Sequence, residues 1–239
     1  MKSPIFGRKL VTWIMAVFFI HVLTLLPYDI SNAIGVRKTS DMIEKEKVLK
    51  GKLSKHPDDH VSITALGELH WENGSRKVAI RLFKKAMKIA PGYPLPYFFL
   101  ARAYFFEKNP KKGKVQFDIF EEKMDILIAE DKSNGIFYTS CLSKMARLFV
   151  TRNMHDEALR IYRKIAELEP LNQRAHYNMA VCYYSFFHNR SRAYKELKIV
   201  MEIGTDRNLS DKAAFFIDYM RNNPDSRYTE DFSFIESGD

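Results

Sequence analysis

Two histidines, His56 and His60, lie four residues apart in the sequence. On one helix this spacing would place both imidazoles on the same face, where they could bind a transition metal. However, Pro57 stands between them, and the segment is typical of a loop that enters a helix. No other group of cysteines and histidines has the spacing of metal ligands, so we predict neither a metal site nor a cofactor.

The two cysteines, Cys141 and Cys182, are the next candidates for reactive side chains. Each lies in an apolar run, which is typical of a buried thiol that packs as a small hydrophobic group. A disulfide bond between them is the alternative. The sequence has no pattern of an activated nucleophile and no glycine-rich phosphate loop. It therefore predicts a protein that is not an enzyme and has no catalytic residues.

The formal net charge of +9 is spread along the 239 residues, with one local cluster of basic side chains. Such a cluster could bind nucleic acid, but Lys and Arg also cover helix faces that meet water. We favour the solvated helix face and do not expect nucleic acid as a partner. The cluster consists of Arg76, Lys77, Arg81, Lys84, Lys85 and Lys88.

Small and large apolar residues alternate in two short runs that a tight turn at Gly74 would join. Gly67 lies in the first run, a helix expected over about residues 61–71, and Ala79 lies in the second, expected over residues 76–89. Small side chains let two helices approach closely, while large apolar ones fill the grooves beside them. The pattern predicts an antiparallel helical hairpin.

The same hairpin pattern recurs, since Ala101 stands 34 residues after Gly67 and two further units follow. These units resemble the tetratricopeptide repeat, whose pattern is W-x2-L-G-x2-Y, then A-x3-F, then P. The first and third units match best, and the second lacks the closing proline. The first-helix residues that carry the resemblance are Ile63, Leu66, Gly67 and His70; Tyr97, Leu100, Ala101 and Tyr104; Leu142, Met145, Ala146 and Phe149; His176, Met179, Ala180 and Tyr183.

The resemblance implies an all-α fold, in which antiparallel helix pairs stack into a right-handed solenoid. A hydrophobic helix at the N-terminus would precede this solenoid. The implied repeats are four, at residues 60–93, 94–138, 139–172 and 173–206. A generic helical bundle is the alternative.

The spacing between the second and third units departs from the family pattern. Gly113 and Ala158 are 45 residues apart instead of 34. The excess is close to three helical turns, so it could lengthen the helix over residues 114–132 and keep later faces in phase. Alternatively, an extended loop could form around Asn134 and Gly135, and the sequence leaves both alternatives open.

The segments beside the repeats fit the same architecture. Residues 34–59 are expected to form a linker that contains a short helix. Residues 207–224 are expected to form a helix, capped by Ser210, that covers the last exposed apolar face of the array. Residues 225–239 form an acidic tail.

The first 33 residues have the composition of a signal anchor or signal peptide. Residues 10–26 are uncharged and largely apolar, and basic residues precede them. We favour an uncleaved membrane anchor, with cleavage near Ala33 as the alternative. The basic flank predicts that the body lies beyond the membrane, in a bacterial periplasm, or is secreted after cleavage.

The resemblance also implies a concave surface, lined by the first helix of each repeat, that binds a partner segment. Family members that bind chaperone C-termini hold a carboxylate with Lys, Asn and Arg, whereas Glu68 would repel one, so we do not expect that ligand. The surface combines aromatic rings with arginines, as binding hot spots do. Core packing is the alternative for the aromatic rings. The predicted partner-binding residues are Glu68, Trp71, Phe98, Arg102, Phe105, Arg147, Arg174, Tyr177 and Tyr184.

The leading functional hypothesis is a non-enzymatic adaptor or scaffold, membrane-tethered or secreted, that binds a protein or peptide segment on this surface. The alternative is a structural assembly factor that self-associates through its repeats and is therefore a homo-oligomer. A nucleic-acid-binding repeat protein is a lesser alternative, because it would require a cytoplasmic body.

Overall fold

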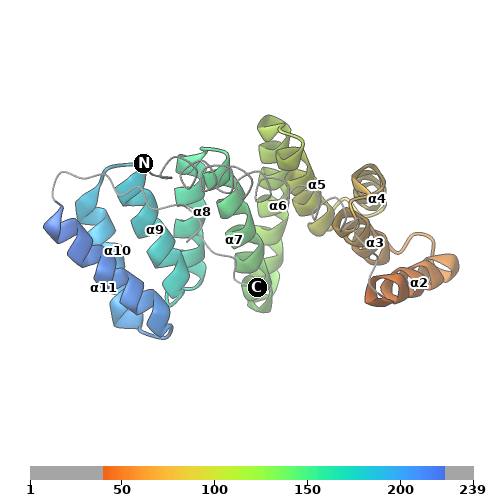
Figure 1. Ribbon diagram of the computed structural model, residues 1–239. Helices are drawn as coiled ribbons and strands as arrows, with labels where there is room; N and C mark the ends of the chain where they lie inside the picture. Colours follow the sequence, from red (N-terminus) through yellow and green to blue (C-terminus); the bar gives the residue numbers. More distant parts are fainter. Residues whose placement is uncertain (1–39, 224–239) are drawn as a thin grey trace, which may run out of the picture. The chain divides into compact units, whose positions relative to one another are not determined.

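A computed structural model describes residues 40–223, which are helical with short connections (Figure 1). The predicted membrane segment at residues 10–26 and the acidic tail at 225–239 lie outside the described residues. Within residues 40–223 no strand is present, and no helix is both long and apolar enough to cross a membrane. The helices are α2 (Ser40–Lys55), α3 (His60–Glu72), α4 (Arg76–Ile89), α5 (Leu95–Phe106), α6 (Pro110–Glu130), the 3-10 helix η1 (Lys132–Asn134), α7 (Gly135–Thr151), α8 (His155–Leu168), α9 (Gln173–Ser185), α10 (Arg190–Ile203) and α11 (Arg207–Asn222).

The described chain divides into two compact units, and the division falls between Arg81 and Leu82, inside α4. In the first unit, α2 packs against α3. The side chain of Asp59 caps α3 by accepting hydrogen bonds from the backbone N–H groups of Val61 and Ser62, both at 3.1 Å. The second unit contains α5 to α11.

Consecutive helices of the second unit pack as pairs, α5 with α6, α7 with α8, and α9 with α10. Successive pairs are joined by contacts of α5 with α7 and of α8 with α9, and α11 packs on α10 and α9. The predicted fold class is therefore confirmed: the described chain is all-α and its helices pack in adjacent pairs.

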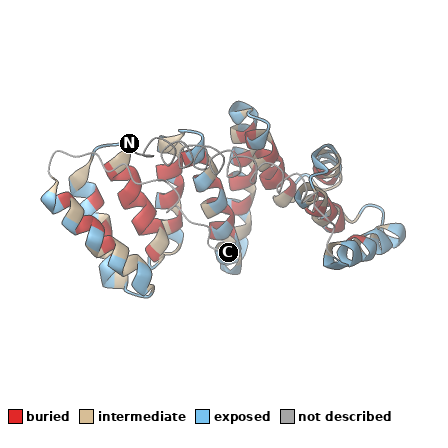
Figure 2. Cartoon of the chain, in the orientation of Figure 1, coloured by how far each residue is buried: buried red, intermediate tan, exposed pale blue. Residues whose placement is uncertain are grey.

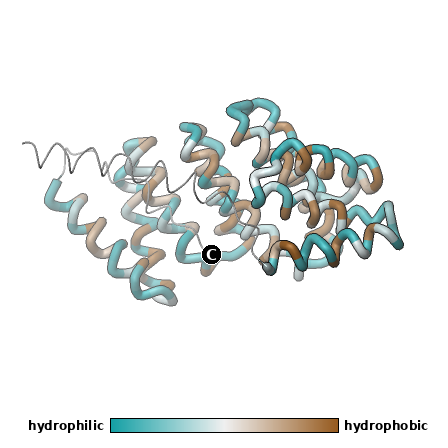
Figure 3. The backbone as a smooth tube through the Cα atoms, turned by 45° about the vertical axis from the view of Figure 1, so that its right-hand side comes forward, coloured by the Kyte–Doolittle hydropathy of each residue, from teal (hydrophilic) through white to brown (hydrophobic). Residues whose placement is uncertain are grey.

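The small residues that carry the repeat pattern are buried, as the sequence predicts. Ala101, Ala146, Ala158, Ala180 and Ala193 have no exposed surface. Buried positions form a stripe along one side of most helices (Figure 2), and hydrophobic positions recur between hydrophilic ones along each helix (Figure 3). The amphipathic stripes thus supply the core between the helix pairs.

The extra residues between Gly113 and Ala158 lie in two long helices rather than in a loop. α6 has 21 residues and α7 has 17, whereas α8 has 14 and α9 has 13. The extended loop around Asn134 and Gly135 is wrong, because Gly135 already begins α7. Asn134 turns the chain, and its side-chain amide donates to the backbone oxygens of Leu127 at 3.3 Å and Asp131 at 3.1 Å.

The last helix begins at Arg207, as predicted, but its cap is a different residue from the predicted one. Asp206 caps α11 by accepting the Leu209 N–H at 3.2 Å, so the predicted cap Ser210 lies inside the helix instead. Ser210 has another partner, since the buried Gln173 amide donates to its hydroxyl at 2.9 Å and to the Val200 carbonyl at 2.9 Å. Gln173 therefore ties α9 to the end of α10 and the start of α11.

Candidate partner-binding site

Polar side chains of α7 and α9 surround a small pocket of about 130 Å³ in the second unit. On α7 the lining positions 140, 143, 144 and 147 follow the spacing of one helix face. On α9, Arg174 and Asn178 lie one turn apart on one face. We call this the basic pocket, and it is lined by Ser140, Ser143, Lys144, Arg147, Tyr162, Asn172, Arg174, Ala175 and Asn178.

All the charged residues that line the basic pocket are positively charged. Lys144, Arg147 and Arg174 line it, and none of its lining residues is acidic. Lys144 and Arg147 are exposed and Arg174 is half-buried. Three cations beside hydroxyl and amide groups can bind an anionic group, such as a carboxylate, through charge-assisted hydrogen bonds.

The floor of the basic pocket includes a buried hydroxyl. The Tyr162 side chain is 1% exposed, and its hydroxyl is buried without a hydrogen-bond partner within the described residues. Burial raises the pKa of Tyr162 above its ordinary value, so the phenol stays protonated and keeps a proton to donate. A buried donor without an acceptor costs free energy.

The structure brings two of the predicted binding residues together, because Arg147 on α7 and Arg174 on α9 both line the basic pocket. Arg102 does not join them. Its guanidinium lies 5.5 Å from the centre of the Phe98 ring and 6.0 Å from that of the Phe99 ring, so it packs against two aromatic rings of the same helix, α5.

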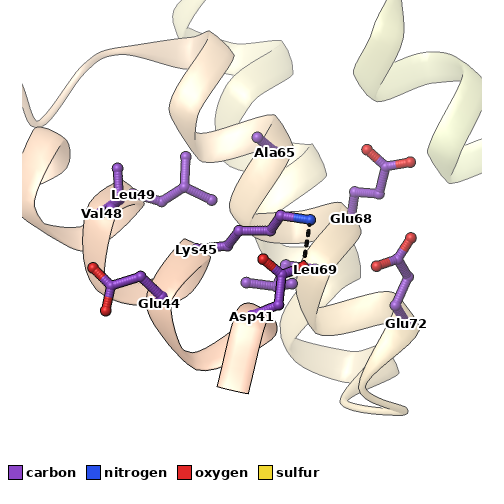
Figure 4. Close-up of a pocket in the computed structure, with 9 residues that line it drawn as sticks. All are labelled: Asp41, Glu44, Lys45, Val48, Leu49, Ala65, Glu68, Leu69 and Glu72. Carbon is purple, nitrogen blue, oxygen red and sulfur yellow. Dashed lines mark ion pairs between the residues drawn. The ribbon is translucent and has the colours of Figure 1, made fainter. Parts of the chain in front are cut away.

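Two predicted residues belong to the first unit. Glu68 lines a different pocket, between α2 and α3 (Figure 4). Trp71 is half-buried, and the Arg76 guanidinium lies 5.7 Å from the centre of its ring. The six residues of the basic cluster on α4 are all exposed, as the residues of a solvated helix face are.

Four of the predicted residues are core residues, and their assignment to the binding surface is wrong. Phe98 is 2% exposed, Phe105 has no exposed surface, and Tyr177 and Tyr184 are each 3% exposed. The rings of Phe98, Phe105 and Tyr184 pack on neighbouring aromatic rings, as in the edge-on pairs of Phe105 with Phe149 and of Tyr184 with Phe216. A partner could not reach these rings without unpacking the core.

The sequence could have identified two residues of the basic pocket that our prediction missed. Ser140 and Lys144 stand in the same positions relative to Ala146 as Arg174 and Asn178 do relative to Ala180. Both helices therefore present the same face to the pocket. Tyr162 could not be found in this way, because it lies on α8 and reaches the pocket only through packing.

Neither cysteine has the surroundings of a reactive group. Both Cys141 and Cys182 are buried and free, so the alternative of a disulfide bond is wrong. Burial raises the pKa of the Cys182 thiol to about 12, which keeps it protonated at neutral pH. Among residues 40–223, no three His, Cys, Asp or Glu side chains are grouped as a metal site would require.

Comparisons with known proteins agree with this architecture. The family model described as "Tetratricopeptide repeat" matches residues 62–93, which span α3 and α4. A crystal structure of MamA is 21% identical, covers 71% of this chain and 94% of its own, and superposes with a TM-score of 0.53. A second MamA structure is also 21% identical, with coverages of 74% and 91% and a TM-score of 0.52.

No curated protein sequence matches the chain. At 21% identity the two MamA structures show a shared fold and nothing more. Residues 62–93 thus match the tetratricopeptide repeat, and the described chain shares the fold of the two MamA structures.

Proposed function

We propose that the protein is a non-enzymatic adaptor that binds an acidic segment of a partner protein at the basic pocket between α7 and α9. The observation that carries the proposal is the lining of this pocket, in which Lys144, Arg147 and Arg174 surround hydroxyl and amide groups without an acidic residue. The volume of about 130 Å³ fits one carboxylate side chain rather than a whole ligand. The pocket would therefore fix one acidic residue of a longer bound segment.

The positions of these residues support a bound segment of protein. Lys144 and Arg147 lie on the first helix of one pair, and Arg174 lies on the first helix of the next. In repeat proteins, equivalent helices of successive repeats form an extended binding surface. A segment that crosses from α7 to α9 would contact all three cations, and Arg side chains at such positions commonly carry much of the binding energy.

The test compares capture of partner proteins by the full chain and by the R147Q/R174Q variant, followed by binding of peptides from the captured partner. The variant should weaken binding of an acidic peptide by about a hundredfold or more, since it removes two arginines and each charge-assisted hydrogen bond contributes roughly 1.5–3 kcal/mol. Replacing Glu and Asp of the peptide by Gln and Asn should weaken wild-type binding similarly. The control K111Q removes an exposed lysine of α6 and should bind as the wild type does.

Equal binding by the R147Q/R174Q variant would contradict the proposal. If the wild type instead forms oligomers at micromolar concentration that the variant does not form, the protein is the self-associating assembly factor. Sedimentation of both proteins, each with residues 1–33 present, distinguishes these outcomes.

We further propose that residues 10–26 tether the protein to a membrane with the body on the extracytoplasmic side. The support is the uncharged run itself and the basic residues before it. Secretion after cleavage near Ala33 is the alternative. A reporter that is active only outside the cytoplasm, fused after Asp239, should be active, and N-terminal sequencing of the mature chain should begin at Met1 for an anchor.

A further inference from the structure

A second pocket, of about 470 Å³, lies between α2 and α3 in the first unit (Figure 4). It is separate from the basic pocket in its residues and opposite to it in charge. We call it the acidic pocket, and it is lined by Asp41, Glu44, Lys45, Val48, Leu49, Ala65, Glu68, Leu69 and Glu72.

The floor of the acidic pocket is apolar. Val48 and Leu49 of α2 face Ala65 and Leu69 of α3 across it (Figure 4). Leu69 is buried, but Val48 is 49% exposed, so part of this apolar surface meets water. A volume of about 470 Å³ lies in the range of pockets that bind ligands, and it would accept more than one apolar side chain.

The rim of the acidic pocket carries carboxylates on both helices. Asp41 and Glu44 are three residues apart on α2, and Glu68 and Glu72 are four residues apart on α3. Each pair is therefore spaced by about one helical turn along its helix. Each of the two helices therefore contributes two carboxylates to the lining.

One cation, Lys45, lines the acidic pocket against these four acidic residues. Its ammonium lies 2.8 Å from an Asp41 carboxylate oxygen, in a pair whose side chains are 63% and 71% exposed. An exposed pair of this kind is weak and easily exchanged. The pocket thus keeps a net negative charge, although the whole chain carries +9.

We propose that the acidic pocket binds a basic amphipathic helix of a partner protein. Apolar side chains of that helix would pack on Val48, Leu49 and Leu69. Lys or Arg side chains spaced by three or four residues on either side would pair with the carboxylates of α2 and α3. Charge complementarity selects this partner, because the lining holds four carboxylates and one ammonium, and an acidic segment would add like charges to them.

The test measures binding of a labelled, amidated helical peptide of leucines and lysines to the full chain in mild detergent, by fluorescence anisotropy. The E68Q/E72Q variant keeps the shape of the pocket but removes two charges, and it should bind about tenfold more weakly at low salt. The V48N variant alters the apolar floor at an exposed position and should also bind several-fold more weakly. The control E122Q/E130Q removes two exposed charges of α6 and should leave binding unchanged.

Two further probes decide which occupant is correct. The same peptide with glutamate in place of lysine should not bind, and its binding would overturn the proposal. Unchanged binding by E68Q/E72Q would overturn it as well. If R37Q/K38Q greatly strengthens peptide binding, the chain's own residues before α2 occupy the pocket, and the proposal of a partner helix is wrong. Circular dichroism of each variant verifies its helical content.

Discussion

Gly113 shows how a single residue determines the packing of a helix pair. It lies on α6, and a Cβ atom built on it would stand 2.6 Å from Cδ2 of the Phe105 ring on α5. Phe105 has no exposed surface and is held edge-on against Phe149, with ring centres 5.3 Å apart. The ring therefore has little room to move away from an added methyl group.

The substitution Gly113→Ala should lower the free energy of unfolding by roughly 1 kcal/mol in urea titrations. Overpacking costs about 1–3 kcal/mol, and the better helix propensity of alanine returns about 1 kcal/mol. The matched control is Gly51→Ala on α2, where a Cβ would meet nothing within 4 Å. It should be neutral or stabilising, and a stabilising effect of Gly113→Ala would contradict the close approach of Phe105.

The predicted binding residues also illustrate what residue type alone can and cannot decide. Arg147 and Arg174 were predictable, because long charged side chains on a first helix remain accessible even when the helix is largely buried. Phe98 and Tyr184 were not, because an aromatic ring fits a binding surface and a core equally well. Only the structure shows the neighbouring rings, such as Phe216 beside Tyr184, and these contacts place Tyr184 in the core.

At the scale of elements, α6 and α8 are joined by a cluster of charges around Glu121. This carboxylate is 7% exposed and accepts hydrogen bonds from both terminal nitrogens of Arg160, at 3.1 Å and 2.7 Å. Lys164 adds an ion pair to Glu121 at 3.4 Å and another to Asp125 at 2.9 Å. The long helix α6 is thereby fixed in register against α8.

Replacing Arg160 by Met should lower the free energy of unfolding by about 2 kcal/mol, because it leaves the buried Glu121 carboxylate with a single long ion pair. Adding Glu121→Gln to that variant should recover part of the loss. The control is Arg221→Met, whose partner Asp218 is exposed. It should cost less than about 0.5 kcal/mol, and an equal cost for both arginines in urea unfolding would contradict this account.

His176 links α9 to α10 in a way that depends on pH. Its Nδ1 lies 2.8 Å from a Glu196 carboxylate oxygen, and its Nε2 lies 3.1 Å from the Pro170 carbonyl oxygen. Both partners are acceptors, so both hydrogen bonds form only when the imidazole is doubly protonated. The hydrogen bond to Glu196, more than that to Pro170, raises the pKa of His176 above its ordinary value.

The stabilisation from His176 should be complete at a pH below the unfolded-state pKa of about 6.5 and should disappear as the pH rises through the higher folded-state pKa. Thermal unfolding of the wild type and of Glu196→Gln should therefore differ most at about pH 5.5 and converge in alkaline solution. A difference that grows as the pH rises would contradict the assignment. NMR titration of the His176 ring provides an independent measurement.

At the scale of the whole molecule, the contacts of the second unit run between neighbouring helices. α11 packs on α10 and α9, and Phe216 places its fully buried ring 5.3 Å from that of Tyr184. Repeat proteins with such contacts lose stability locally, since each unit depends on its neighbours.

The substitution Phe216→Ala should destabilise the C-terminal helices by about 3–5 kcal/mol. Amide hydrogen exchange should accelerate in peptides from α9, α10 and α11 and remain unchanged in α2 and α3. The neighbouring Phe215 is 61% exposed, so Phe215→Ala should leave exchange near wild-type rates throughout. A uniform loss of protection after Phe216→Ala would show that the chain unfolds as one cooperative unit.

The sequence by itself determined the helical periodicity, the pairing of helices and the burial of small residues at the repeat positions, because these follow from side-chain size and spacing along one chain. It also showed that the insertion before Ala158 could be helical, since its length matches whole turns. Only the tertiary structure showed that the insertion lies in both α6 and α7 and that four of the predicted aromatic residues are buried in the core. It also showed that Glu68 lines one pocket, whereas Arg147 and Arg174 line another of opposite charge. Those outcomes depend on which faces meet between helices, and that is decided by packing among residues distant in the sequence.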